Sequence, residues 1–260
     1  MRRTNPRLVT VALVATVLFG CSSYPDQAGS SGAGSGPPDA VPDAGDSQVD
    51  SGQPDAGDGA VAPYGEVLFD GTDTTAWKMA GLGSFDLVDG SLVANPGDGL
   101  GLFWCTVVTP ADFVLELEWR RTAEDDNSGV FVRFPDPDSQ GYDNTAWVAV
   151  HFGFEVQIDE TGAPDGAAVH KTGAIYEQAG QQLSQIPALP VGEWNEYRIS
   201  VLGQTYRVVL NGTQVTEWSF PGDPNAPDRG LPSTPAEPRY IGLQSHTGHV
   251  EFRNVVLRAP

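Results

Sequence analysis

The sequence has few cysteines and few basic residues. Only two of its 260 residues are cysteines, Cys21 and Cys105, which is too few for a disulfide framework. Lysine and arginine number 14 against 34 aspartates and glutamates, so the net charge is −20. This balance argues against binding to nucleic acid, which requires a basic surface, and against charge-driven binding to an anionic bilayer.

Long regular apolar patterns are also scarce. No amphipathic run with a 3.6-residue period and the length of a helix stands out. The apolar run Leu8–Phe19 has 12 residues, too few to span a bilayer. It follows three arginines, Arg2, Arg3 and Arg7, and this layout predicts a signal peptide over residues 1–20.

The apolar run ends in Leu18-Phe19-Gly20-Cys21, which resembles a bacterial lipobox, although Phe19 is bulkier than usual. The resemblance implies cleavage before Cys21 and lipidation, including palmitate, on Cys21 itself. The serine after Cys21 resembles the residue that follows the lipidated cysteine in lipoproteins sorted to the outer membrane. We therefore expect a lipid-anchored envelope protein, with its domain in the periplasm or at the cell surface. The alternative is an ordinary secretory signal with an incidental cysteine.

Residues 22–63 consist mostly of Gly, Ser, Pro, Ala and Asp. Such a segment cannot bury enough apolar surface to offset chain entropy, so we predict a disordered linker over residues 21–63. The globular domain is then residues 64–260, which carry 11 basic and 27 acidic residues and a net charge of −16. Cys105 follows Trp104 in an apolar stretch, which favours a small buried hydrophobe over a nucleophile.

The domain is predicted to be all-β. Its candidate strands are short, mostly alternating, and separated by turn residues. About fourteen strands in one domain predict a two-sheet jelly-roll sandwich, with Asp89-Gly90 and Asn211-Gly212 as hairpin turns. The predicted strands are Glu66–Phe69, Phe85–Val88, Ser91–Ala94, Leu102–Val107, Phe113–Arg120, Gly129–Phe134, Trp147–Val150, Phe154–Asp159, Gly173–Tyr176, Asn195–Leu202, Thr205–Leu210, Thr213–Phe220, Tyr240–His246 and Val250–Leu257.

One strand, Phe154–Asp159, separates its side chains cleanly, because successive residues point to opposite faces. Three apolar residues share one face, and Glu155, Gln157 and Asp159 share the other. The polar face is either the floor of a cleft or a solvated surface, and we favour the cleft. If strands with the same alternation are neighbours, they form one polar sheet face bearing Glu118, Arg120, Arg133, Glu155, Gln157, Asp159, Gln244 and His246.

Nine sequence blocks follow one another over roughly residues 65–258. They are Val67-Leu68-Phe69-Asp70-Gly71 with Trp77, Phe113–Arg120, Asn127–Arg133, Phe154–Asp159, Thr172–Tyr176, Gly192–Asn195, Leu210–Gly212, Ile241–His246 and Val250–Val255. Any one block is weak, but the nine in this order resemble the 3-keto-disaccharide hydrolase domain family. That family is a concanavalin-like jelly roll, and its members are usually exported.

The resemblance implies cleavage of glycosides whose sugar carries a ketone at C3. The ketone acidifies the C2 proton, and the enolate left by its removal can expel the aglycone from C1. Such a reaction needs a base, an acid and stabilisation of the enolate. On this basis we expect Glu155 and His246 to be the catalytic acid–base pair. The expected substrate-binding residues are Asn127, Arg133, Gln157, Asp159, Tyr176 and Gln244.

Several of these residues also have a structural interpretation. Arg120 and Arg133 could pair with Glu118 and Glu155, and His246 could be a hydrogen-bonded residue at the rim. No cofactor is expected; a divalent metal on Glu155, Asp159 and His246 is chemically possible, but no spacing demands it.

Two other functions remain open. An ordinary retaining glycosidase would need a second carboxylate about 5–5.5 Å from Glu155. On a plain strand Asp159 would lie about 13 Å away, which does not fit. The other alternative is a non-catalytic carbohydrate-binding module, for which an open groove lined by Trp104, Trp147 or Trp218 would be the sign.

Two segments could reshape the cleft. The stretch Trp147–His151 could be an extra strand over its mouth, and the proline-rich stretch Pro221–Pro238 is expected to be a long ordered loop.

Overall fold

The computed structural model describes residues 61–260. The predicted signal peptide, Cys21 and the linker up to residue 60 lie outside the described residues. Val61 and Ala62 already pair with Val108, so the packed domain includes residues just before the predicted start at Tyr64. Among residues 61–260, no helix is both long enough and apolar enough to cross a membrane.

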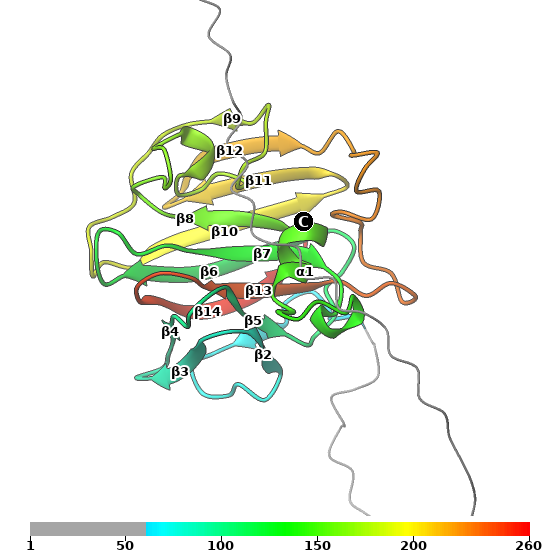
Figure 1. Cartoon of the computed structure of the whole chain (residues 1–260), viewed down its shortest axis with the longest axis horizontal. Coiled ribbons are helices and arrows are strands. Elements are labelled where there is room, and N and C mark those ends of the chain that lie inside the picture. Colours follow the sequence, from blue (N-terminus) through cyan, green and yellow to red (C-terminus); the bar gives the residue numbers. More distant parts are fainter. Residues whose placement is uncertain (1–60) are drawn as a thin grey trace, which may run out of the picture. The chain divides into compact units, whose positions relative to one another are not determined.

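The domain is a sandwich of two antiparallel sheets, which confirms the predicted all-β jelly-roll class (Figure 1). The smaller sheet has five strands in the order β2-β5-β13-β7-β8. These strands are β2 (Trp77–Gly81), β5 (Gly101–Cys105), β7 (Ser128–Phe134), β8 (Phe154–Ile158) and β13 (Tyr240–Ser245).

The larger sheet has nine strands in the order β3-β4-β14-β6-β10-β11-β12-β9, with β1 paired to β14. Three short helical segments lie outside the sheets: η1 (Pro137–Ser139), α1 (Trp147–Phe152) and η2 (Ala168–His170). The strands of the larger sheet are β1 (Val67–Phe69), β3 (Ser84–Val88), β4 (Ser91–Asn95), β6 (Phe113–Arg121), β9 (Gln182–Leu183), β10 (Asn195–Leu202), β11 (Thr205–Leu210), β12 (Thr213–Ser219) and β14 (Val250–Arg258).

The main hydrophobic core fills the space between the sheets. Alternate residues of β7 and β8, such as Val130 and Val156, meet alternate residues of β6 and β10, such as Leu117 and Ile199. Cys105 is buried in this core, as predicted, and burial raises the pKa of its thiol to about 12. The alternation therefore fixes which side chains of β7, β8 and β13 must point outward.

Both predicted hairpin turns are present. Asp89 and Gly90 have φ of 48° and 80°, and Asn211 and Gly212 have 49° and 78°. Positive φ at both central residues is what a type I′ turn requires.

Two predicted strands are wrong. Trp147–Val150 belongs to α1, which packs Ala149 against Phe131 and Phe134 on the outer face of the five-stranded sheet. Gly173–Tyr176 is an irregular segment that follows the edge of β8, with one bridge, Val156 to Ile175, and three backbone hydrogen bonds to Glu155 and Gln157. Four consecutive apolar or small residues carry too little periodicity to distinguish these structures.

The predicted single polar face is also wrong in part. Glu118 and Arg120 lie on β6, which belongs to the nine-stranded sheet. Their outward side is the opposite surface of the sandwich from the outward side of β8. Alternation shows that a strand has a polar side, but it does not show which strands are neighbours.

Arg133 does not point outward with Phe131. It has a positive φ of 60° at an irregularity in the pairing of β7 with β13, which interrupts the alternation. Its guanidinium turns to the other side of the sheet, 5.7 Å from the ring centroid of Tyr206. The side chain is fully buried and donates to the backbone oxygens of Ala111, Gly203 and Gly230. Arg133 therefore stabilises loops, and the prediction that it lines the site is wrong.

Candidate functional site

Five polar side chains gather over β8, β7 and β13, and we call them the polar strip: Asn127, Glu155, Gln157, Gln244 and His246. Phe154, Val156 and Ile158 face the core, so the intervening Glu155 and Gln157 face outward. On β13 the same logic puts Gln244 outward between the inward Leu243 and Ser245. Strand β7 separates β8 from β13, so the two polar rows approach each other only across β7.

Gly129 on β7 is what allows that approach. A Cβ atom at this position would lie 2.1 Å from Glu155 Oε1 and 2.6 Å from Glu155 Cγ. The Glu155 side chain therefore lies flat across the space that a side chain at position 129 would occupy, and Gln244 on β13 lies near enough to favour its ionised form. A larger residue at 129 would force Glu155 to move.

The Glu155 carboxyl group is buried, and its surroundings favour the protonated form. Burial, assisted by the nearby carboxylate of Glu177, raises its pKa from 4.5 to about 8, while the side chain of Gln244 opposes this shift. Glu155 is therefore mostly a neutral acid at pH 7.

Three acceptor atoms in the polar strip are buried and have no hydrogen-bond partner among the described residues: Glu155 Oε1, Gln157 Oε1 and Gln244 Oε1. An unsatisfied buried acceptor costs about 1–3 kcal/mol, so three on one face call for an explanation. Hydroxyl groups of a ligand, or water, would supply the missing donors.

The orientation of Gln157 is set by a chain of side-chain hydrogen bonds. Asp159 Oδ2 accepts from Asn127 Nδ2 at 3.1 Å, which directs Asn127 Oδ1 toward Gln157 Nε2 at 3.4 Å. The Gln157 amide nitrogen is thereby committed, and its oxygen remains available. Asn127 thus acts by holding Gln157.

Asp159 itself is occupied by the loop that follows it. Its carboxylate accepts five hydrogen bonds, from Asn127 Nδ2, Thr161 N and Oγ1, Gly162 N and Ala163 N. It is 1% exposed. The prediction of direct substrate binding by Asp159 therefore does not match its contacts; Asp159 anchors the loop and, through Asn127, orients Gln157.

His246 lies at the accessible end of the strip, just beyond β13. Thr247 pairs with Asn127 through two backbone hydrogen bonds, which hold this end of the chain against β7. Although the ring is exposed, neighbouring protein groups displace enough water to lower the pKa of His246, and Asp159 opposes the shift. His246 is therefore largely neutral at pH 7.

Tyr176 forms the wall of the strip on the β8 side. Its backbone N–H donates to Glu155 O at 2.9 Å, and its ring lies 5.2 Å from that of His170. Burial and the surrounding carboxylates, led by Glu177, raise the pKa of Tyr176 to about 12, so it remains a neutral phenol. Glu177 was not identified from the sequence; its only signal there is its position directly after Tyr176.

The tryptophans do not form an open sugar-binding groove. Trp104 and Trp218 are each 4% exposed, and they pack on Tyr240 and Phe154 respectively. Trp147 is partly buried on α1. Within residues 61–260 there is also no group of three His, Cys, Asp or Glu side chains arranged to hold a metal ion.

A family model described as the 3-keto-alpha-glucoside-1,2-lyase-like domain matches residues 65–258. The chain belongs to this family. The 3-keto-α-glucoside-1,2-lyase-like domain therefore occupies nearly all of the described residues, and the resemblance inferred from the motifs is confirmed. No functionally curated protein matches the chain.

Solved structures show the same fold. A Parabacteroides distasonis ATCC 8503 protein named "putative glycosyl hydrolase" is 27% identical, with a TM-score of 0.55, over 75% of this chain and 98% of that one. A second from this organism, described in the same words, is 21% identical, with a TM-score of 0.58, over 75% and 93%. A Bacillus subtilis protein of unknown function with a galectin-like fold is 14% identical, with a TM-score of 0.53, over 76% and 96%. The lyase-like domain thus shares its jelly-roll sandwich fold with these three proteins.

Proposed function

We propose that this domain cleaves glycosides whose sugar carries a ketone at C3, by removing the C2 proton and eliminating the group on C1. The family description supports this reaction class. The observation that carries the proposal is the polar strip, which combines a buried acid of raised pKa, a histidine of lowered pKa and the two unpaired amide oxygens of Gln157 and Gln244.

The reaction balances without a cofactor. A base takes the C2 proton, and the bonding electrons form an enolate with the C3 oxygen. When the C3 carbonyl re-forms, the C1–C2 double bond forms and the C1–O bond breaks. The departing oxygen takes a proton from an acid, giving an alcohol and an unsaturated keto sugar. Addition of water to that double bond would complete a net hydrolysis.

The environments of the two titratable groups support one distribution of roles, because they shift the two pKa values in opposite directions. Neutral His246 is the base that takes the C2 proton. Neutral Glu155 is the acid that donates to the departing oxygen. The oxygens of Gln157 and Gln244 accept hydrogen bonds from sugar hydroxyls and orient the ring.

An ordinary paired-carboxylate glycosidase is the second function to test. Asp159 is committed to its loop, but the Glu177 carboxylate lies close enough to raise the pKa of Glu155. A pair formed by Glu155 and Glu177 would cleave glucosides that have not been oxidised.

The direct test incubates the full chain with p-nitrophenyl 3-keto-glucoside and, separately, with p-nitrophenyl glucoside. We expect nitrophenol release from the keto sugar alone, lost in Glu155→Gln and in His246→Ala. Release from both sugars would establish ordinary glycoside hydrolysis instead. Saturable sugar binding without release would make the domain a binding module.

The pH profile tests the assignment of roles. kcat/KM should rise with pH as His246 loses its proton, at a pKa below 6.5, and should fall again as Glu155 loses its proton near pH 8. If Glu155 were the base and no protonated histidine were needed, the rate would instead rise through pH 8 and stay high.

We also propose that the protein is a lipoprotein of the cell envelope, anchored through Cys21 and acting on an oligosaccharide or glycoside. The lipobox-like sequence supports this proposal. Fractionation of cells expressing wild type and Cys21→Ser tests it. The variant should leave the membrane fraction, and membrane association that survives the substitution would contradict the lipid anchor.

A further inference from the structure

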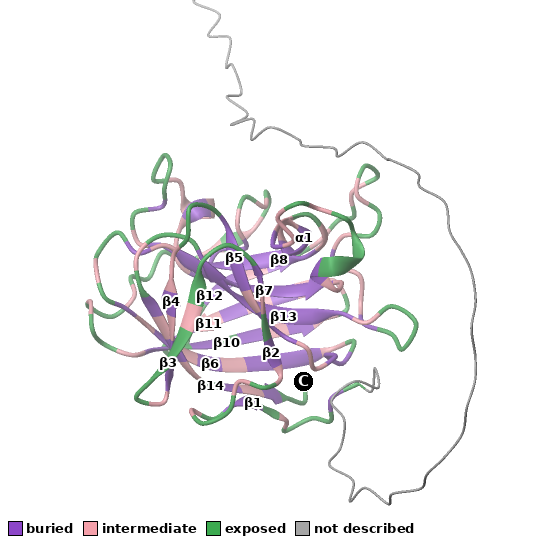
Figure 2. Cartoon of the chain, turned by 60° about the horizontal axis from the view of Figure 1, so that its bottom comes forward, coloured by how far each residue is buried: buried purple, intermediate pink, exposed green. Residues whose placement is uncertain are grey.

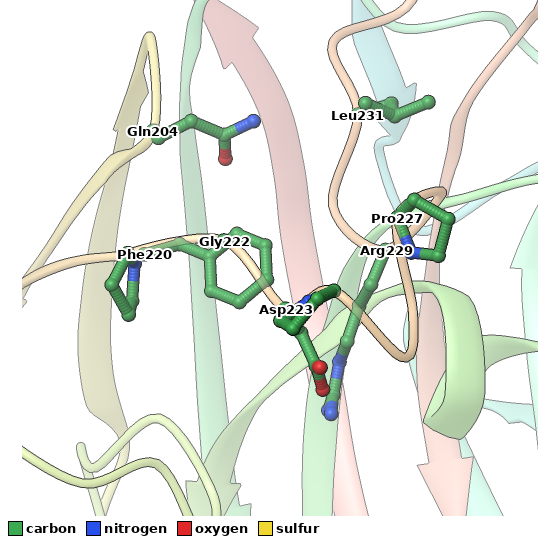
Figure 3. A pocket seen from close by; sticks show the side chains of 9 residues that line it. Gln204, Phe220, Gly222, Asp223, Pro227, Arg229 and Leu231 are labelled. Carbon is green, nitrogen blue, oxygen red and sulfur yellow. The ribbon is translucent and has the colours of Figure 1, made fainter.

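An open depression of about 560 Å³ lies along the loop between β12 and β13 and shares no residue with the polar strip (Figure 3). This loop is the ordered proline-rich stretch expected from the sequence. Three of its prolines rim the depression, and each fixes the backbone locally. Three polar side chains reach into it: Gln204 from the turn before β11, and Asp223 and Arg229 from the loop.

Arg229 differs from every other arginine in residues 61–260. Each of the others lies within 4.0 Å of a carboxylate, whereas Arg229 has no such partner. In a domain with a large excess of acids, such an arginine is unexpected. Burial lowers the pKa of Arg229, and the negative charge of Asp223 opposes that effect.

The guanidinium of Arg229 is nevertheless held in place. Its Nε donates to Gly153 O at 3.1 Å, and its Cζ lies 4.8 Å from the ring centroid of Phe154. These contacts leave the Nη atoms without a hydrogen bond among the described residues. The donors are therefore pre-oriented, which reduces the entropy lost when a ligand binds.

Gln204 adds an unsatisfied acceptor to the same depression. Its Oε1 atom is buried and has no hydrogen-bond partner in the described part of the chain. The side chain points toward the middle of the depression in Figure 3. Phe220 lines the depression with an aromatic ring that packs on Phe154 at 5.0 Å.

We propose that this depression is a second carbohydrate-binding site, which takes a neutral sugar residue through Arg229, Asp223 and Gln204. The guanidinium donates to ring and hydroxyl oxygens, and the carboxylate and the amide oxygen accept from hydroxyl groups. Phe220 offers an apolar surface to the C–H groups of the sugar. The charges of Arg229 and Asp223 balance each other, so an anionic ligand is disfavoured.

The second site adjoins the beginning of β8. Arg229 packs on Phe154, the residue directly before Glu155, and the Glu177 carboxylate perturbs the pKa of both Arg229 and Glu155. A distal residue of an oligosaccharide could therefore occupy the depression. Binding there does not depend on the proposed cleavage, so either claim can fail alone.

The test is calorimetric titration of the full chain with maltotriose, an unoxidised neutral trisaccharide. Arg229→Gln and Asp223→Asn should each weaken binding at least about ten-fold, while release from p-nitrophenyl 3-keto-glucoside stays within two-fold of wild type. Arg198→Gln, on the outer face of the other sheet, is the matched control and should bind as wild type does. Thermal unfolding verifies that each variant is folded.

Three results would overturn the second site. The first is no maltotriose binding by the wild type. The second is binding that survives Arg229→Gln but is lost in Gln244→Ala, which would place the sugar in the polar strip. The third is preference for trigalacturonate, strengthened by Asp223→Asn, which would make the depression an anion site. Maltotriose binding that Arg229→Gln weakens, without any cleavage of the keto sugar, would support the second site and contradict the proposed function.

Discussion

The outer faces of the two sheets both carry polar residues, but these form ion pairs on one face and do not on the other. On the nine-stranded sheet, Glu116 lies between Arg198 and Arg258, and Glu118 accepts from Arg253 Nε at 2.7 Å. On the five-stranded sheet, β7, β8 and β13 are buried along their length (Figure 2), and the polar strip contains no ion pair among the described residues.

Trp194 extends the pairing on the nine-stranded sheet. Its ring lies 4.7 Å from the guanidinium of Arg120 and 3.9 Å from that of Arg253. The charged side chains on that face pair with one another in contact with water, so no ligand is needed to balance them. The polar strip instead holds three buried acceptor oxygens without partners among the described residues, an arrangement that costs stability and is characteristic of sites that bind or react.

The largest expected difference is in activity. Glu155→Gln should lower kcat for the keto glucoside by about 10²–10⁴-fold, because the amide cannot donate the proton to the departing oxygen. Glu116→Gln, the matched change on the paired face, should stay within two-fold. Equal losses in the two variants, measured by nitrophenol release, would remove the distinction between the faces.

The second difference is in stability at alkaline pH. The folded-state pKa of Glu155 is above its unfolded value, so the native state binds the extra proton between pH 4.5 and about 8, and stability falls as pH rises through that window. Glu155→Gln removes this loss, which is at most about 4 kcal/mol at pH 8 at about 1.4 kcal/mol per pH unit. Urea unfolding of both proteins at pH 5 and pH 8 measures it. An unchanged difference between the two pH values would mean that Glu155 is ionised in the native state.

Arg133 should be the costliest charged residue to remove. Arg133→Met leaves several buried backbone oxygens without donors, so we expect about 3 kcal/mol of destabilisation in urea. A loss below about 1 kcal/mol would show that water replaces the guanidinium.

Gly129→Ala tests the path of the Glu155 side chain. The added methyl group should displace the carboxyl and lower kcat by about 10–100-fold. Gly242→Ala is the matched control on β13, since its Cβ would meet Leu102 Cδ1 at 2.7 Å and no polar strip residue. Both variants should lose about 1–3 kcal/mol of stability, but only Gly129→Ala should shift the alkaline limb of the pH profile.

The smallest effect is expected on the paired face. Arg198→Gln should change the free energy of unfolding by less than about 1 kcal/mol, because exposed ion pairs contribute little. A larger loss that disappears in 1 M salt would show that the charges act as a network.

Strand alternation predicted both the sandwich and most of the polar strip. It placed Glu155 and Gln157 on one face of β8, and the structure brings Asn127, Gln244 and His246 beside them. It failed at Arg133 because one residue with positive φ reverses the face of every side chain beyond it. Nothing in the local sequence marks that position, since arginine has no preference for positive φ.

Other features depend on contacts that a linear pattern does not contain. The prediction that Glu118 and Glu155 share a face was wrong because it depended on which strands are neighbours. Alternation within a strand does not contain that information. Asp159 follows Glu155 and Gln157 at the two-residue spacing expected of a third side chain on the same face. Only its hydrogen bonds from the backbone N–H groups of the following loop reveal its structural role. Glu177 affects Glu155 through space, where a turn at positive φ brings it close.

The anchoring of the loop by Asp159 has a consequence for how such a site can diversify. The carboxylate binds the backbone of residues 161–163, whose N–H groups are present whatever the side chains. The segment beyond them is held by other contacts, among them Asp165 with His170 and the N–H of Glu177 with Val169 O. Residues 164–169 could therefore be exchanged between homologues, or grafted in the laboratory, together with their partners His170 and Glu177, while the orientation of Gln157 is preserved. The residues of the polar strip would then keep their arrangement on the sheet while the sequence of the loop changes.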